Sequence, residues 1–275
     1  MQNSLDNVKV LEIFSKSKDG IESHSGDAVL VSENYLAVID GATPKGTRLW
    51  NGQKGDAFVS EFIKGVIEKM PSDLLATEAI AKINDSVREI YIKYGTSYEE
   101  LLPEERLQAS LVIYSVKRRE IWSFGDCKFK VNTKNYDTTR HADKLLSDLR
   151  ALYTELARIE GKATDQDVGR EAIMPLLKKV IGLANAKGTF GYDAINGGPV
   201  NPKNTEVIKL NEGDFVVLAS DGYPELFDTL EKTENNLFTL LKKDPNCINE
   251  LRSTKGLKKG NESYDDRSYV SFYVN

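Results

Sequence analysis

Histidine and cysteine are scarce in this sequence, and their scarcity removes several kinds of catalytic site. Among 275 residues there are two histidines, His24 and His141, and two cysteines, Cys127 and Cys247. A histidine-rich zinc site or a Ser-His-Asp triad is hard to build from two histidines. Two cysteines give neither a disulfide framework nor a zinc-binding pattern. We therefore look for the chemistry among other side chains.

Long apolar runs and an excess of positive charge are also missing. No apolar run approaches the roughly 18 residues that a membrane span requires, so we expect no membrane partner. The N-terminal residues lack the charged and apolar regions of a signal peptide, which favours a cytoplasmic protein. The net charge is −5 and the pI is near 5.4, with no dominant basic stripe, which argues against a nucleic-acid partner.

Several motifs of phosphate-binding and hydrolytic proteins are incomplete. The loop 41–46 has the glycine spacing of a P-loop, but Thr47 and Arg48 stand where a lysine and a hydroxyl residue are required. Cys247 and Arg252 are too close together for a cysteine-dependent phosphatase. No Asp-x-Asp pair follows an early strand, and there is no Gly-x-Ser-x-Gly nucleophile elbow. The sequence thus offers no evident protein nucleophile.

The sequence does contain apolar runs that stop abruptly at Asp-Gly. The runs 35–39 and 215–220 end at Asp40-Gly41 and Asp221-Gly222. Such runs predict buried strands, and a glycine at the end lets the backbone turn and a ligand approach closely. Two of them, far apart in the sequence, predict strands that converge and bring two carboxylates to one point, as sites for hard divalent cations require.

Three further acidic residues adjoin strand-like runs: Asp27, Asp126 and Asp265. Any one of them could be a simple turn residue, because aspartate and glycine are common in turns. Five in one chain favour a metal site, and aspartates with a backbone carbonyl and waters suit Mg²⁺ or Mn²⁺ better than zinc. Two such ions, roughly 3.5–4 Å apart, can bind a phosphoryl oxygen and deprotonate a bridging water, which requires no protein nucleophile.

The order of the predicted elements is strands, helices and strands again. Strands are expected at 8–14, 28–31, 35–39, 108–116, 120–131, 207–210, 215–219 and 268–274, and helices at 54–70, 73–94, 141–181 and 225–254. The last strand cannot bury its face alone, so it must return to the sheets that the first strands form. This order predicts one α+β domain, residues 1–275, in which helices cover a sandwich of sheets.

Two segments of the middle region have their own patterns. Leu145, Leu149, Leu152, Leu156 and Ile159 form an apolar stripe at helical spacing, which we interpret as core packing. Residues 184–204 are rich in glycine, asparagine and proline and predict a long irregular flap. Loops of that length inside a compact domain are often functional.

Taken together, the acidic motifs resemble those of the metal-dependent protein phosphatase family, also called protein phosphatase 2C, in its bacterial form. The resemblance extends from about Val8 to Val274, and the motifs follow the family's order. They are Gly26-Asp27-Ala28, Val38-Ile39-Asp40-Gly41, Gly125-Asp126, Leu218-Ala219-Ser220-Asp221-Gly222 and Asp265-Asp266. The resemblance implies a four-layer αββα fold, in which two antiparallel sheets form a central sandwich flanked by helices and the metals lie at one edge.

The resemblance also implies a role for each acidic residue. Asp40 would bridge two Mn²⁺ or Mg²⁺ ions, and Asp221 would be the second catalytic carboxylate. The implied ligands are Asp40, Asp221 and Asp265 at the first ion, Asp27, Asp40 and the Gly41 carbonyl at the second, and Asp126 with Glu225 at a weaker third site. The flap at 184–204 would lie where relatives carry a variable segment that contacts substrate.

The sequence departs from the family at two positions. Ala42 stands where many relatives have a histidine, and no arginine precedes Asp27, where many relatives use one to bind the substrate phosphate. We choose Arg48 as the replacement, because only a guanidinium restores the fork geometry that pairs with phosphate. Lys16, Lys18 and Lys45 are the other candidates.

Three functions fit this pattern. The first is a metal-dependent phosphomonoester hydrolase that acts on phosphoserine or phosphothreonine of a phosphorylated protein substrate. The second is a pseudophosphatase that keeps the fold as a binding or regulatory module, and the third is a phosphatase of a small phosphorylated metabolite. The retained carboxylates favour an enzyme, whereas the missing arginine favours the module. The pattern carries no signal for the oligomeric state.

Overall fold

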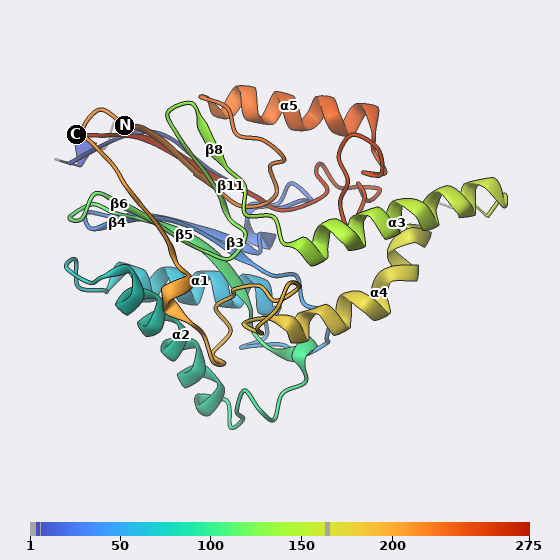
Figure 1. Ribbon diagram of the computed structural model, residues 1–275, viewed down its shortest axis with the longest axis horizontal. Helices are drawn as coiled ribbons and strands as arrows, with labels where there is room; N and C mark the ends of the chain where they lie inside the picture. The colour runs from blue at the N-terminus through green and yellow to red at the C-terminus, as the bar shows by residue number, and fades with distance from the viewer. Residues whose placement is uncertain (1–3, 6, 163–165) are drawn as a thin grey trace.

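Two antiparallel β-sheets form the centre of the structure, a computed structural model that describes residues 4, 5, 7–162 and 166–275 (Figure 1). Within those residues, the first sheet has six strands in the order β1-β2-β11-β10-β7-β8. They are β1 (Ser4–Leu5), β2 (Val8–Lys16), β11 (Arg267–Val274), β10 (Phe215–Ala219), β7 (Lys128–Val131) and β8 (Lys134–Tyr136). The C-terminal strand β11 lies between β2 and β10, as the prediction that it returns to the early strands requires.

The second sheet has five strands in the order β3-β4-β5-β6-β9. They are β3 (Asp27–Val31), β4 (Tyr35–Gly41), β5 (Ala109–Ser115), β6 (Glu120–Phe124) and β9 (Glu206–Lys209). Side chains of a strand alternate between its two faces. In β4, Leu36 and Val38 pack into the core between the sheets, whereas Tyr35, Ala37 and Ile39 pack into the core beneath the helices. Both faces are buried, which explains an apolar run without polar alternation.

Helices cover the outer face of each sheet (Figure 1). α1 (Gly55–Glu68) and α2 (Ala76–Lys93) pack on the second sheet, and α5 (Leu230–Lys243) packs on the first. The layers are therefore helix, sheet, sheet and helix, and the predicted four-layer α+β fold is confirmed. Short 3₁₀ helices lie at Glu22–His24, Pro103–Glu105, Ile181–Leu183 and Pro202–Asn204.

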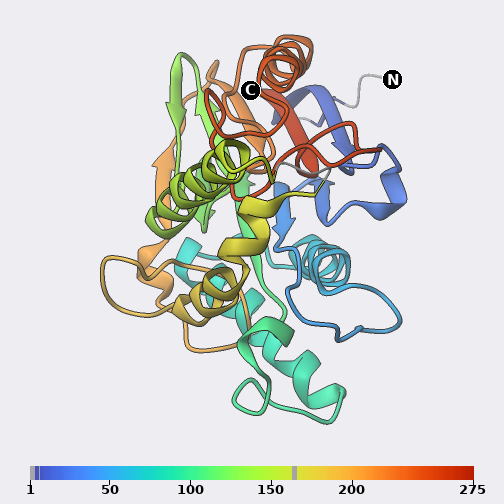
Figure 2. The same ribbon diagram turned by 90° about the vertical axis from the view of Figure 1, so that its right-hand side faces the viewer.

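α3 (His141–Ile159) and α4 (Val168–Val180) form a hairpin that projects from one end of the sandwich. Figure 2 shows this end, with both helices lying in front of the sheets. Arg150 of α3 is buried, and its guanidinium binds Asp167 before α4, with Nη2 2.7 Å from the carboxylate. The same guanidinium donates to the carbonyl oxygens of Cys247 and Ser253, each at 3.1 Å. Arg150 thus joins the hairpin to the segment that follows α5.

The interpretation of the α3 stripe as core is wrong. Leu145, Leu152, Leu156 and Ile159 are between 44% and 77% exposed. The small core between the two helices uses a different face of α3, through Leu146, with Leu149 only partly buried against it. Helical spacing shows that the apolar residues share a face, but it does not show that another element covers that face.

Two predicted element boundaries are also wrong. The strand expected at 120–131 is two strands, β6 and β7, and they belong to different sheets. The chain crosses between the sheets at Gly125, whose φ of +102° is a conformation that favours glycine. The helical region expected at 225–254 contains only α5, and residues 244–266 are irregular.

The predicted flap, 184–204, has no strand and only one short helical turn. Its first half is largely exposed, but residues 194–198 are buried. Asn84 of α2 accepts hydrogen bonds from the backbone N–H groups of Asn196 and Gly197, and Ile195 pairs with Ala109 of β5. Over the parts of the chain that the structure describes, no helix has the length and apolar character needed to cross a membrane.

Candidate metal centre

Three neighbouring strands of the second sheet bring acidic residues to one edge. Antiparallel pairing places Asp27, the first residue of β3, directly opposite Asp40 near the end of β4. On the other side of β4, Asp40 pairs with Ser110 of β5. The Ser110 hydroxyl donates a hydrogen bond to Asp126, which follows β6. Strand register alone therefore aligns three of the predicted acidic residues.

The first sheet supplies the other acidic residues at the same edge. β10 pairs with β11, and the N–H of Ser220 still donates to the Ser268 carbonyl, so Asp221 comes directly after the end of the sheet. Asp265 lies two residues before the start of β11, the neighbouring strand. Because consecutive strands run in opposite directions, the residue after β10 and the residue before β11 lie at the same edge.

The two sheet edges meet at a cavity of about 430 Å³. Its lining includes Asp40, Gly41, Asp126, Asp221 and Asp265, which are five of the predicted site residues. Asp27 does not line this cavity, although it lies opposite Asp40 in the sheet.

Two predicted site residues lie elsewhere. Glu225 is exposed and does not line the cavity. Arg48 does not line it either, because the loop turns its guanidinium onto Trp50, with the guanidinium carbon 4.6 Å from the ring centroid. The structure therefore gives no support to Glu225 as a ligand or to Arg48 as the phosphate-binding residue.

Gly41 must be a glycine because the backbone around it is closely packed. A Cβ at this position would lie 2.3 Å from the Asp56 carbonyl oxygen and 2.6 Å from the Gly26 carbonyl oxygen. The Gly41 N–H donates to that Gly26 oxygen at 3.1 Å. This packing holds the backbone that follows Asp40 against the start of α1 and explains the Asp-Gly pair.

Burial and mutual repulsion shift the pKa values of the clustered carboxylates. Burial raises the pKa of Asp40, and the negative charges of Asp221 and Asp27 raise it further. The pKa of Asp27 is raised by burial and then by Asp266. Burial, followed by repulsion from Asp265, raises the pKa of Asp221 to about 7. Burial and the neighbouring carboxylates thus outweigh the lysines that favour the charged form of Asp221, namely Lys255 and Lys128.

The donor atoms fit Mg²⁺ or Mn²⁺. All are oxygens, the type that these hard cations prefer. Asp27 Oδ2 is buried without a hydrogen-bond partner, and no salt bridge to Asp40 or Asp221 occurs in the described residues. Within the same residues, no three His, Cys, Asp or Glu side chains are gathered as a complete metal-binding set. Mg²⁺ commonly binds through one or two carboxylates and keeps several waters, so it does not need such a set.

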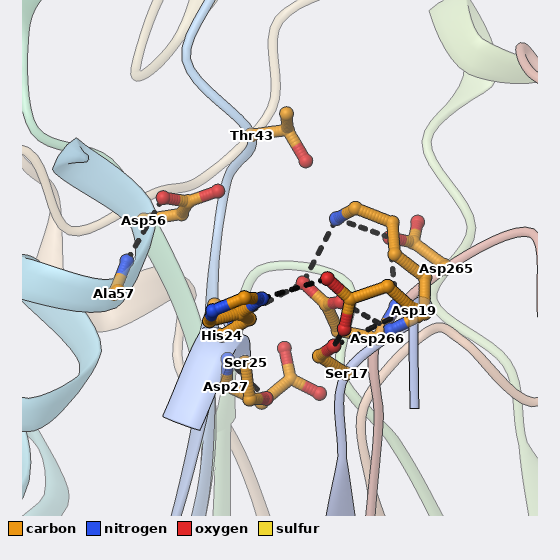
Figure 3. Close-up of polar contacts among 12 residues, drawn as sticks. Ser17, Asp19, His24, Ser25, Asp27, Thr43, Asp56, Ala57, Asp265 and Asp266 are labelled. Carbon is orange, nitrogen blue, oxygen red and sulfur yellow. Dashed lines mark hydrogen bonds and ion pairs between the residues drawn. The ribbon is translucent and has the colours of Figure 1, made fainter. Parts of the chain in front are cut away.

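Other carboxylates at this edge already have cationic partners. Lys18 Nζ lies 3.0 Å from Asp266 Oδ2 and 3.9 Å from Asp265 Oδ1. Lys255 forms a close ion pair with Asp265, and these two lysines lower the pKa of Asp265 even though burial opposes the shift. Figure 3 shows Asp27, Asp265 and Asp266 near one another. Thr43 lies in the loop that follows β4, and Asp56 lies in the first turn of α1.

Sequence reasoning missed three residues of this region. Arg140, whose Nη2 lies 2.8 Å from Asp126, follows β8 and carries no recognisable motif. Lys255 lies in an irregular segment, Asp56 lies in the first turn of α1, and neither belongs to an acidic motif of the sequence. Lys18 was a candidate only because it precedes Asp27. These residues can be recognised only from the folded structure, because none of them lies in a sequence pattern that indicates a site.

Comparisons with known proteins give the class of the fold. No protein-family model matches the sequence, and no curated protein matches it either. Among solved structures, the catalytic domain of the serine/threonine phosphatase PstP in complex with two manganese ions is similar over 96% of this chain and 98% of its own, with 15% identity and a TM-score of 0.50. The match extends over nearly the whole of both chains, so this chain has the fold of the metal-dependent, protein phosphatase 2C-type phosphatases.

Two further solved structures are similar to this chain. One is the serine/threonine phosphatase PstP/Ppp of Mycobacterium tuberculosis, with 14% identity, a TM-score of 0.49, and coverage of 97% of this chain and 99% of the other. The other is the serine/threonine phosphatase Stp1 of Staphylococcus aureus, with 14% identity, a TM-score of 0.49, and coverage of 96% and 94%.

Proposed function

We propose that this protein is a Mn²⁺- or Mg²⁺-dependent phosphomonoester hydrolase that acts on phosphoserine or phosphothreonine in proteins. The observation that carries the proposal is the convergence of Asp40, Asp221, Asp265 and the Gly41 carbonyl at one cavity, with Asp27 opposite Asp40. The phosphatase PstP, whose fold this chain shares, binds two manganese ions in its solved structure. A cytoplasmic location is part of the proposal.

The residues at the cavity would have different roles. Asp27, Asp40, Asp221, Asp265 and the Gly41 carbonyl would hold two ions, and Asp126 would contribute to a weaker third site. When bound, such ions neutralise phosphoryl oxygens and activate water for in-line attack. Asp126 accepts hydrogen bonds from Ser110 and Arg140, which fix the orientation of its carboxylate.

Lysines at the edge of the cluster suit phosphate binding. Lys255 lines the cavity and touches Asp265, so its ammonium group lies beside the place where a phosphoryl group would meet the carboxylate-bound ions. A phosphomonoester carries about two negative charges near neutral pH, and charge-assisted hydrogen bonds bind it strongly. This assignment replaces Arg48. The pseudophosphatase alternative is less well supported, because a binding module has no need of repelling carboxylates that face an open cavity.

The proposal is tested by phosphate release from phosphoserine and phosphothreonine peptides and from an aryl phosphate. The protein is first treated with a chelator, and Mn²⁺ is then restored. We expect hydrolysis only with the metal, and no radiolabelled phosphoenzyme, because a metal-activated water attacks phosphorus without a protein nucleophile. Full activity in chelator, a trapped phosphoenzyme, or no hydrolysis with any divalent cation would contradict the proposal.

A further inference from the structure

Among the residues that the structure describes, eight positively charged side chains line the cavity, and three of them, Lys45, Arg170 and Lys255, come from three separate segments. Lys45 lies in the loop that follows β4, Arg170 in the first turn of α4, and Lys255 in the irregular segment between α5 and β11. They are close enough to repel one another, since both Lys255 and Arg170 disfavour the charged form of Lys45. A group of like charges around one cavity is costly unless an anion binds there.

Lys45 has no acidic partner of its own. In the described part of the chain, its ammonium group forms no salt bridge and donates only to the Thr43 carbonyl oxygen, at 2.5 Å. Burial lowers the pKa of Lys45 to about 7, and the charges of Lys255 and Arg170 contribute to the shift. A partly buried lysine without a carboxylate partner is a group that an anionic ligand would satisfy.

The backbone holds the other two cations in place. Arg170 Nη1 donates to the Thr254 carbonyl at 2.7 Å, which ties α4 to the residue that precedes Lys255. The buried Arg150 guanidinium fixes the same segment through the Ser253 carbonyl. These contacts position the cationic side chains before any ligand arrives, and a preorganised site loses less affinity to ordering.

The acidic residues nearby do not balance these cations. Asp265 pairs with Lys255, but Asp265 is also an expected metal ligand. A bound metal ion would therefore compete with Lys255 for this carboxylate. Asp143 is the remaining acidic neighbour of Lys45, and burial raises its pKa, which favours its neutral form. Asp167, the acidic neighbour of Arg170, already pairs with the buried Arg150 at 2.7 Å.

We propose that Lys45, Arg170 and Lys255 form an anion subsite beside the metal centre, which selects phosphorylated segments that carry a second anionic group, a carboxylate or a phosphate, next to the phosphorylated residue. The inference rests on the proposed function. The cavity volume of about 430 Å³ lies in the range of ligand-sized pockets, so it has room for more than one phosphoryl group. The ions at Asp40 would neutralise the phosphoryl group that is cleaved, with Lys255, which pairs with Asp265, beside both anions, and Lys45 and Arg170 are then available to the second anion.

The test compares three phosphoserine peptides that differ only in the neighbouring residue: alanine, glutamate, or a second phosphoserine. We expect kcat/KM of the wild-type protein with Mn²⁺ to be at least about tenfold higher for the glutamate and doubly phosphorylated peptides, which corresponds to about 1.4 kcal/mol. In Lys45→Met and Arg170→Gln, this ratio should fall toward one.

Arg252→Met is the matched control. Arg252 is a cation at the same cavity, but it already pairs with Asp148 at 2.6 Å. Its loss changes the net charge equally and should leave the ratio at the wild-type value. The melting temperature of each variant shows whether it is folded. Lys45→Met should not lower the melting temperature, because Lys45 has no carboxylate partner to lose.

Binding of the same peptides, measured by calorimetry in chelator, separates the subsite from the proposed function. If the protein hydrolyses the three peptides equally and binds them equally, the subsite is wrong and the phosphatase assignment stands. If no peptide is hydrolysed but the doubly charged peptides bind more tightly and lose this advantage in Lys45→Met, the subsite stands without the enzyme. An equal loss of kcat/KM for all three peptides in Lys45→Met would place Lys45 on the cleaved phosphate and overturn the proposal.

Discussion

Lys45 is a residue whose surroundings make a measurable prediction about pH. Its pKa in the folded protein is about 7, against an ordinary value of 10.5, because burial, Lys255 and Arg170 disfavour the charged form while Asp265 and Asp143 favour it less strongly. A lysine with a lowered pKa destabilises the folded state wherever the unfolded chain holds the proton more tightly. The penalty is complete below pH 7 and disappears as the pH rises toward 10.5.

Lys45→Met should therefore be more stable than the wild-type protein at pH 6, and the difference should shrink steadily between pH 7 and pH 9. Unfolding by urea at several pH values, in chelator, measures this difference in the free energy of unfolding. Lys232→Met serves as a control that removes the same charge, because Lys232 is exposed on α5. A difference that stays constant with pH would show that Lys45 has an ordinary pKa.

Among single residues, the proposed metal ligands are easier to predict from the sequence than the cationic side chains near them. Asp40 and Asp221 can be found because a strand end and a glycine are local signals. Arg48 could not be judged from sequence, since its side chain depends on how the loop folds back onto Trp50. Lys255 lies ten residues before Asp265, and the irregular segment between them forms no element that a periodic pattern would reveal.

At the scale of elements, α3 shows the limit of a periodic pattern. The hairpin of α3 and α4 has its small core around Leu146, Ile173 and Leu177. The exposed residues Leu156 and Ile159 lie on another face of α3. The helical nature of α3 follows from the sequence, but its end at Ile159 does not, because the sequence predicts one helical region at 141–181. The buried face depends on where the rest of the chain lies.

This correction predicts unequal effects of substitutions in the hairpin. Ile159→Ser should change the free energy of unfolding by less than about 0.5 kcal/mol, as exposed substitutions usually do. Ile173→Ala, at a fully buried position, should cost about 2–5 kcal/mol. Urea unfolding of both variants makes the comparison. A loss in Ile159→Ser as large as that in Ile173→Ala would mean that the stripe is packed in solution.

At the scale of the whole molecule, the site depends on pairing between the two ends of the chain. β11 pairs with β2 along its length, and Asp265 and Asp266 reach the site only because β11 enters the first sheet between β2 and β10. The order of strands and helices predicted this closure and a sandwich of sheets covered by helices, and the resemblance to the phosphatase family implied the four layers. The crossing from β6 to β7 between the sheets was not predicted, because an unbroken run of β-forming residues does not show where a strand changes sheets.

The central claim is that the carboxylates at this edge bind divalent cations. Calorimetric titration of chelator-treated protein with Mn²⁺ tests it most directly, in the wild-type protein and in Asp40→Asn, with Asp85→Asn as a control at an exposed position of α2. We expect two Mn²⁺ ions per chain in the wild-type and Asp85→Asn proteins, and affinity reduced at least about tenfold in Asp40→Asn, which would remove one of the proposed charged ligands. Unchanged Mn²⁺ binding in Asp40→Asn, or no binding by the wild-type protein, would contradict the account.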